Sequence, residues 1–274
     1  MPKNGQAKVL SNEELNSVLE EIEHHRYPEK NALIIQISFK LGLRAQEMSL
    51  LRIREVATLS QEFSRGYQIK DVLVLPKSFT KGARAMAANG NRTNARTSVR
   101  FTIAEFDSLV ARIGRDARNG KTLRAADYYP ELKKPGGQTR ELPLADSALL
   151  DAISRYLDVR MAHQKPLKPS DPLILSQKGG FYSPNTLQDH IATMLREWSG
   201  IDRASSHSGR RTLATKLLRD QNEHLKTVQK VLGHKDAATT TIYQDVTEQE
   251  VKDVLTSVGK SYKNSPDIST LACF

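Results

Sequence analysis

The stretch LGHKDAATTTIY, from Leu232 to Tyr243, puts a histidine directly after a Leu-Gly helix ending and a tyrosine nine residues farther on. Three earlier stretches also place reactive residue types beside expected helix boundaries: GLRAQE (42–47), KKPGGQTR (133–140) and HSGRR (207–211). Each is a weak signal by itself, because an arginine at a helix start is usually a surface residue. Their order and spacing carry more information than any one of them.

The chain around the last two stretches is expected to be helical. Ser183 and Pro184 predict an N-cap followed by a proline at the first helical position, and Gly200 ends that helix. Thr247 and Glu250 form a capping box that begins another helix. The helices expected after residue 200 cover about 208–220, 224–232 and 247–258.

The first half of the chain combines helices with short strands. A capping box at Ser11 begins a helical block that reaches about residue 56, and YQIKDVLVLP (67–76) predicts one strand. Thr102 and Glu105 cap a helix that Gly114 stops, and TRELPL (139–144) predicts a second short strand followed by a helix. The expected fold class is therefore mainly α with a small antiparallel β-sheet (α+β).

Charge indicates a polyanionic partner. The 274 residues carry a formal charge of +10, and no run of eighteen apolar residues predicts a membrane span. The N-terminus lacks the apolar segment of a signal peptide, and the single Cys273 cannot form an internal disulfide, so a cytoplasmic location is expected. Charge alone does not distinguish DNA from RNA or a membrane surface.

One stretch concentrates these cations. Between residues 77 and 100 there is no acidic residue, and Asn89-Gly90 marks a turn. We expect this stretch to contact a nucleic-acid backbone, with a solvated loop as the alternative. Its six cations are Lys77, Lys81, Arg84, Arg92, Arg96 and Arg100.

Taken in order, one set of residues resembles the tyrosine recombinase (phage integrase) family over about residues 11–256. The set consists of Arg44, a turn lysine, His207, Arg210, His234 and Tyr243. The resemblance implies the family's catalytic-domain fold and site-specific recombination of duplex DNA through a covalent 3′-phosphotyrosine, by a tetramer assembled on DNA. The reaction that the resemblance implies needs no cofactor. The sequence agrees, because it holds neither a metal-ligand cluster nor a nucleotide-binding loop.

The resemblance also implies a role for each residue. Tyr243 is the nucleophile, and His207 and His234 supply its base or hydrogen-bond acceptor. Arg44 and Arg210 clamp the non-bridging phosphate oxygens, for which arginine's planar fork is suited. Two residues have supporting roles: Glu47 orients Arg44 or is an ordinary surface glutamate, and Arg211 contacts backbone phosphate.

The lysine that protonates the leaving 5′-oxygen has two candidates. Lys134 precedes Gly-Gly and the TRELPL strand, which matches the family's lysine turn, whereas Lys81 lies in a similar TKG turn nearer Arg44. The surrounding stretches, from SFTKGARA to RTSVRFTIAEF and from LKKPGGQ to TRELPLADSAL, look like two hairpins of similar plan. We favour Lys134.

The sequence departs from the family at its N-terminus. Most members carry a separate helical domain that clamps the opposite face of DNA, whereas here the catalytic pattern begins by Ser11. We therefore expect a tail (1–10), a catalytic domain (11–256) with a basic insertion (about 77–125), and a C-terminal tail (257–274). The insertion, or an accessory DNA-bending or clamp protein, would replace the missing clamp. The alternative functions are a type IB topoisomerase-like relaxing enzyme and a catalytically silent DNA-binding regulator.

Overall fold

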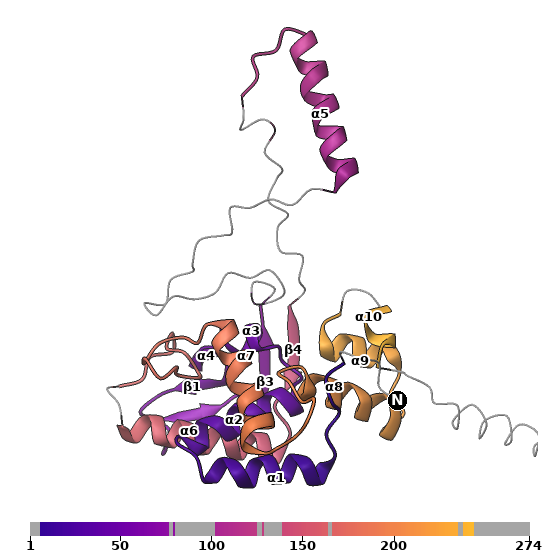
Figure 1. Cartoon of the computed structure of the whole chain (residues 1–274). Helices are drawn as coiled ribbons and strands as arrows, with labels where there is room; N and C mark the ends of the chain where they lie inside the picture. Colours follow the sequence, from indigo (N-terminus) through magenta and orange to yellow (C-terminus); the bar gives the residue numbers. More distant parts are fainter. Residues whose placement is uncertain are drawn as a thin grey trace, which may run out of the picture.

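A central helix, α2 (Pro28–Lys40), organises the fold of the computed structural model, which describes residues 6–76, 79, 102–124, 128, 139–163, 166–234 and 238–243. Nine of the ten residues from Lys30 to Phe39 are buried, all except Ala32, so the rest of the chain encloses α2 on all sides. Helix α1 (Asn12–Glu23), helix α6 (Ser147–His163) and helix α8 (Ser208–Thr215) pack around it. Figure 1 shows this arrangement.

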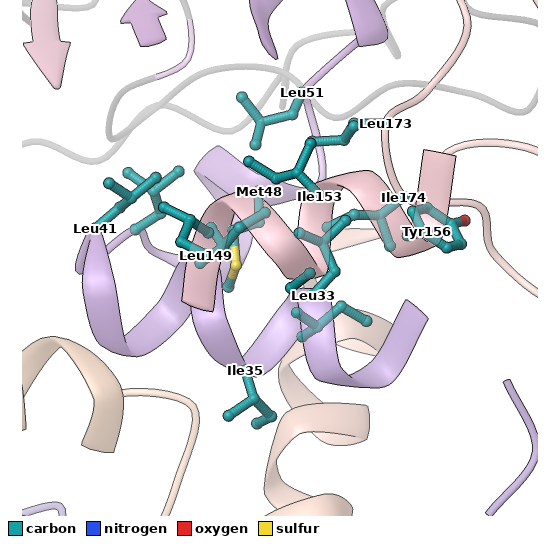
Figure 2. Close-up of a cluster of buried hydrophobic side chains, with 14 of the residues drawn as sticks. Leu33, Ile35, Leu41, Met48, Leu51, Leu149, Ile153, Tyr156, Leu173 and Ile174 are labelled. Atoms are coloured by element: carbon teal, nitrogen blue, oxygen red, sulfur yellow. The ribbon is translucent and has the colours of Figure 1, made fainter. Parts of the chain in front are cut away.

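The main core lies where α2 meets α6 and the chain after it. Leu33 and Ile35 of α2, Leu149 and Ile153 of α6, and Leu173 are fully or almost fully buried there, as Figure 2 shows. Burying one such side chain contributes roughly 1.5–3 kcal/mol relative to leaving it exposed. The core therefore fixes the C-terminal end of α2, from which the first functional stretch, GLRAQE, emerges.

The N-terminal segment is not a tail where the structure describes it. Leu10 is 1% exposed, and its backbone N–H donates to Thr212 Oγ1 at 2.9 Å. The backbone N–H of Lys8 donates to the carbonyl oxygen of Arg203 at 3.1 Å. Residues 6–10, expected as part of a tail, are joined by these hydrogen bonds to the loop before α8 and to α8 itself. The Ser11 capping box that begins α1 is confirmed.

Two small antiparallel sheets replace the single strand expected over residues 67–76. Strand β1 (Ala57–Leu59) pairs with β2 (Tyr67–Ile69), and β3 (Val72–Leu75) pairs with β4 (Arg140–Pro143). Lys70 donates its backbone N–H to Val56, at the first sheet, while the carbonyl of Asp71 accepts from Leu144, at the second. The chain changes partner strand between these two residues, which divides one apolar run into two strands.

The pairing of β3 with β4 makes residues 76–139 one connection. The turns of the two hairpin-like stretches that the sequence suggests, in SFTKGARA and LKKPGGQ, lie outside the described residues apart from Phe79. Helix α5 (Ile103–Arg118) lies within it, and its Thr102–Glu105 capping box is confirmed. Gly114 does not end α5. The helix continues to Arg118, and Gly120 with φ +71° follows it.

The C-terminal helices begin and end close to the expected residues. Helix α7 (Pro184–Thr193) continues as a π-helical turn (Met194–Trp198) before Gly200, and α8 continues as another (Lys216–Asp220). Helix α9 (Leu225–Leu232) ends at Gly233, and a four-residue helix, α10 (Ala238–Thr241), precedes Tyr243. Two short helices, α3 (Ala45–Met48) and α4 (Ile53–Val56), complete the described fold. The helix expected over 247–258 lies outside the described residues.

Gly209 allows α8 to lie directly on α2. A Cβ atom at this position would lie 2.3 Å from Ser38 Oγ and 2.7 Å from the Ser38 carbonyl carbon. Real Cβ atoms do not approach backbone this closely, so any side chain would push the two helices apart. Because His207 and Arg210 flank Gly209, the contact also sets where these side chains lie relative to the end of α2.

We expect Gly209→Ala to lower the free energy of unfolding by about 1–3 kcal/mol, because the added methyl group overpacks the α2–α8 contact. Chemical denaturation measures the loss. Gly114→Ala is the matched control, since a Cβ there meets no atom within 4 Å and alanine favours a helix. Equal stability of Gly209→Ala and the unchanged chain would contradict the proposed contact.

Candidate functional site

Arg44 and Glu47 form the first part of the site, where α2 ends and α3 begins. The backbone N–H of Arg44 donates to Glu47 Oε2 at 2.8 Å, and Arg44 Nη1 donates to Oε1 at 3.2 Å. The side chain of Arg44 is 27% exposed, whereas that of Glu47 is 2% exposed. The alternative of a surface glutamate is therefore wrong. Glu47 is a buried carboxylate that holds Arg44 at both its backbone and its guanidinium.

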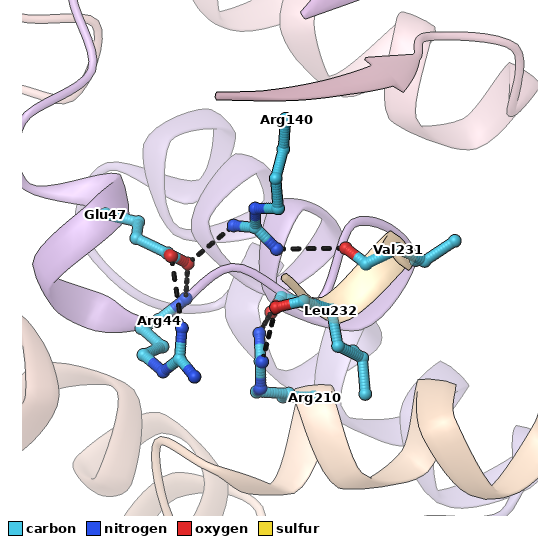
Figure 3. A network of polar contacts seen from close by, with 7 residues as sticks. Arg44, Glu47, Arg140, Arg210, Val231 and Leu232 are labelled. Atoms are coloured by element: carbon cyan, nitrogen blue, oxygen red, sulfur yellow. Dashed lines mark hydrogen bonds and ion pairs between the residues drawn. The ribbon is translucent and has the colours of Figure 1, made fainter. Parts of the chain in front are cut away.

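Arg140 is a functional candidate that the sequence analysis missed. It begins β4, its side chain is 5% exposed, and its Nη2 lies 2.9 Å from Glu47 Oε2. Its Nη1 donates to the carbonyl oxygen of Val231 at 2.9 Å, so one guanidinium joins Glu47 to the end of α9 (Figure 3). Arg140 occupies an inward position of the TRELPL strand, but an alternating pattern that holds an arginine does not show whether that arginine faces the core or the solvent. The distant partners Glu47 and Val231 could not be seen in the sequence.

Gly233 makes room for Arg140. Its φ of +64° ends α9 in the left-handed conformation that favours glycine. A Cβ atom at Gly233 would also lie 2.4 Å from Cδ of Arg140. The Leu-Gly-His sequence thus turns the chain toward His234 and at the same time leaves space for the buried arginine.

Arg210 ties α8 to both of the other segments. Its Nη1 donates to the carbonyl oxygen of Gly42 at 2.8 Å, and its Nη2 donates to that of Leu232 at 2.6 Å. Burial and then the charge of Arg44 lower the pKa of Arg210 to about 10, which leaves it protonated at neutral pH. These carbonyls accept two of the five guanidinium N–H groups of Arg210. Figure 3 shows Arg210 and Arg44 on the same side of the network.

The two histidines lie beside these cations. Desolvation, followed by the charges of Arg210 and Arg44, lowers the pKa of His207, which caps the start of α8. The same causes, with Arg140 added, lower the pKa of His234 to about 4. The Nδ1 of His234 lies 2.8 Å from the buried hydroxyl of Thr240, which holds the ring in place. His234 is therefore neutral near pH 7 and can accept a proton.

Tyr243 completes the group. Its backbone N–H donates to the carbonyl oxygen of Thr240 at 3.1 Å, and its ring stacks on that of His234 with centroids 6.0 Å apart. It packs against the small core formed by Ala214, Leu218, Val228 and Leu232. A negative charge on the Tyr243 oxygen raises the pKa of Arg210.

The structure thus brings together five of the six expected catalytic residues, and it adds Arg140. Arg44 and Arg140 pair with the one carboxylate of Glu47, and Arg210 adds a third guanidinium held by carbonyls, which leaves a positive site suited to a phosphate. Arg211 is half-buried on α8. The described residues contain no group of three metal-ligating side chains and no helix long and apolar enough to cross a membrane.

The lysine candidates and the basic stretch lie outside the described residues, as do all six of its cations from Lys77 to Arg100. The strand register still bears on the lysines. Leu75 and Arg140 are partners at the end of the β3–β4 ladder. Lys81 follows Leu75 by as many residues as Lys134 precedes Arg140, so the ladder gives neither lysine a shorter route to the site.

Comparisons with known proteins agree with this geometry. A sequence model described as "Phage integrase family" matches residues 105–250, just over half of the chain. A tyrosine recombinase XerC from Methylobacterium nodulans is 37% identical over 111 residues, which cover 40% of this chain and 33% of that protein. One from Alcanivorax borkumensis is 35% identical over 122 residues, covering 43% and 38%. The matched part therefore spans little more than a third of these relatives.

Solved structures share the fold across nearly the whole chain. The XerA recombinase aligns with a TM-score of 0.54 at 17% identity, covering 94% of this chain and 66% of that one. The Tn1549 transposon integrase in complex with circular intermediate DNA aligns with a TM-score of 0.54 at 16% identity, covering 93% and 68%. Both alignments extend beyond the sequence match to include the segment that carries Arg44.

Replacing Arg140 tests whether Glu47 depends on it. Arg140→Met should lower the free energy of unfolding by about 2–5 kcal/mol, because it removes one of two cations from a buried carboxylate. In the double variant Arg140→Met with Glu47→Leu, much of this loss should be recovered, since no uncompensated charge remains. Denaturant unfolding of the four proteins gives the coupling energy. Simple additivity of the two single losses would contradict the pairing.

Proposed function

Because this chain belongs to the phage integrase family, we propose that it is a site-specific recombinase that cleaves and rejoins duplex DNA through a 3′-phosphotyrosine. The observation that carries the proposal is the meeting of Arg44, Arg210, His207, His234 and Tyr243 at one positive site. They come from three separate segments of the chain. Two carbonyl contacts of Arg210 and the Glu47 pairs hold those segments together.

The reaction follows from the chemistry of these groups. The phenol oxygen of Tyr243 attacks the phosphorus of the scissile phosphodiester while its proton passes to a neutral histidine. The bond from phosphorus to the 5′-oxygen breaks, which leaves a 3′-phosphotyrosine and a free 5′-hydroxyl. Arg44 and Arg210 stabilise the charge that grows on the non-bridging oxygens. Attack by a different 5′-hydroxyl reverses these steps and exchanges the strands, so the energy of the broken bond is kept.

The proposal also includes the lysine and the DNA-contacting residues that the sequence predicts. Lys134, or Lys81 in its place, gives the proton that the leaving 5′-oxygen needs. The cations from Lys77 to Arg100 and Arg211 contact the DNA backbone, each phosphate neutralised adding about −0.9 to the slope of log affinity against log salt. Four copies assemble on DNA in the cytoplasm, with an accessory clamp protein where the insertion does not suffice, and they act on a mobile element.

Tyr243→Phe tests the nucleophile, because it removes only the attacking oxygen. A nicked suicide duplex, in which the cleaved strand diffuses away, should trap a covalent adduct with the unchanged chain and none with Tyr243→Phe. The affinity for DNA should change by less than about threefold, since one uncharged hydroxyl is lost. An adduct that persists in Tyr243→Phe would move the nucleophile elsewhere, with Tyr262 the next candidate. Relaxation of supercoiled plasmid without strand exchange would favour the topoisomerase-like alternative instead.

The choice of lysine is tested with a duplex that carries sulfur at the 5′-bridging position. A thiolate leaves without protonation, so loss of the proton donor no longer slows cleavage of this substrate. We expect Lys134→Ala to cleave the oxygen substrate about 100-fold or more slowly and the sulfur substrate at nearly the normal rate. Lys81→Ala is the matched comparison. Rescue of Lys81→Ala alone would assign the role to Lys81.

A further inference from the structure

Helix α5 presents an apolar face that no other part of the described chain covers. None of its residues is buried, and Ile103, Phe106 and Val110 are 83%, 55% and 51% exposed. Figure 1 shows α5 standing apart from the other helices. An isolated helix of this length is only marginally stable in water, so an apolar face of this kind normally packs against something.

The spacing of the face is that of a helix pair. Apolar residues recur at alternating intervals of three and four along the whole of α5: Ile103, Phe106, Val110, Ile113 and Ala117. This is the a/d pattern of a seam between two helices, here continued over about two heptads. The stripe is centred on Val110. A second copy of α5 laid antiparallel across it would place Val110 against Val110, the large Ile103 against the small Ala117, and Phe106 against Gly114, beside Ile113.

Gly114 fits the same arrangement. It lies inside α5, where glycine weakens a helix, yet a Cβ atom there would meet nothing within 4 Å in this chain. No contact among the described residues therefore explains the missing side chain. In the antiparallel pair Gly114 lies opposite Phe106, where the absence of a Cβ leaves room for an aromatic ring.

The distribution of charged residues along α5 favours an antiparallel helix pair, and it favours a protein as the partner. The first half of α5 carries Glu105 and Asp107, and the second half carries Arg112, Arg115 and Arg118 with a single acid, Asp116. Antiparallel pairing places the acidic half of each helix beside the basic half of the other and also opposes their dipoles. The helix has equal numbers of acidic and basic residues, so it is not itself a surface for phosphates.

We infer that α5 is a pairing helix, which binds α5 of a second copy of this chain in an antiparallel, two-fold symmetric contact. A pair of 16-residue helices buries less surface than the roughly 1,200 Å² of a stable interface. The contact therefore forms efficiently only where copies are already held close together. DNA supplies that proximity under the proposed function, on which this part of the inference rests.

Disulfide trapping measures the contact directly. The chain has one cysteine, Cys273, so Cys273→Ser gives a clean background, and Tyr243→Phe keeps the DNA intact. Val110→Cys lies at the two-fold axis and should form a disulfide-linked dimer on a long duplex, at least about tenfold more than Ser108→Cys on the opposite face of α5. Ile103→Cys alone should not, because the two copies would lie about 20 Å apart. A mixture of Ile103→Cys and Ala117→Cys proteins should cross-link.

A second pair of variants separates packing from folding. Gly114→Leu keeps a good helix former but fills the space for Phe106, and should reduce Val110→Cys cross-linking about tenfold or more. Ser108→Leu adds the same bulk on the opposite face and should leave it unchanged. Circular dichroism of both verifies that α5 still forms.

The outcomes distinguish this inference from the proposed function. Each protein is also oxidised without DNA at high concentration, where pairing should persist at a lower yield. A chain that binds no DNA but still cross-links through Val110→Cys would overturn the proposed function and keep the helix pair. Cross-linking of Ile103→Cys alone would show parallel pairing and overturn the antiparallel contact. A DNA-bound Val110→Cys protein that yields no more dimer than Ser108→Cys would overturn the pairing altogether.

Discussion

The carboxylate of Glu47 is the one buried anion on which the arrangement of the site depends. It holds Arg44 by its backbone and side chain and Arg140 by its guanidinium, and Arg140 in turn reaches the end of α9. An isolated charge would not remain ionised in such a place, because burial without a partner costs several kcal/mol. The carboxylate and its two arginines therefore have to be buried together. This requirement fixes α3 relative to β4 and α9.

Arg210 extends the network across the small core that carries Tyr243. Its two carbonyl partners, Gly42 and Leu232, belong to the segments that Glu47 and Arg140 already join. Backbone carbonyls orient a guanidinium without neutralising it, so the site keeps an excess of positive charge. A phosphodiester would supply the missing negative charge. Repulsion among the clustered cations lowers the stability of the folded protein. An anionic substrate offsets part of that repulsion when it binds.

Capping residues and glycines in the sequence predicted the helix ends that are set by neighbouring residues. The Ser11 and Thr102 capping boxes, the Ser183-Pro184 start and the Gly233 ending were predicted from the sequence because each acts within one or two turns of helix. The burial of Glu47 and the place of Arg140 depend on partners more than 90 residues away. The division of residues 67–76 between two sheets depends on β1 before them and on β4, 65 to 71 residues after its partners. The spacing of apolar residues along the chain does not indicate such distant partners. The order of Arg44, His207, Arg210, His234 and Tyr243 could be recognised only as a family resemblance.

The low pKa of His234 fits the direction in which the proposed reaction moves protons. Without substrate, desolvation and three arginines keep the ring neutral, so it can accept the proton of the attacking phenol. A phosphodiester placed among the same arginines cancels part of their field and raises the pKa of the ring. The additional negative charge that develops on the phosphate during attack raises it further. The cations that prepare a neutral acceptor before the reaction thus cease to oppose its protonation as the reaction proceeds, and the proton affinity of the histidine increases when it is needed.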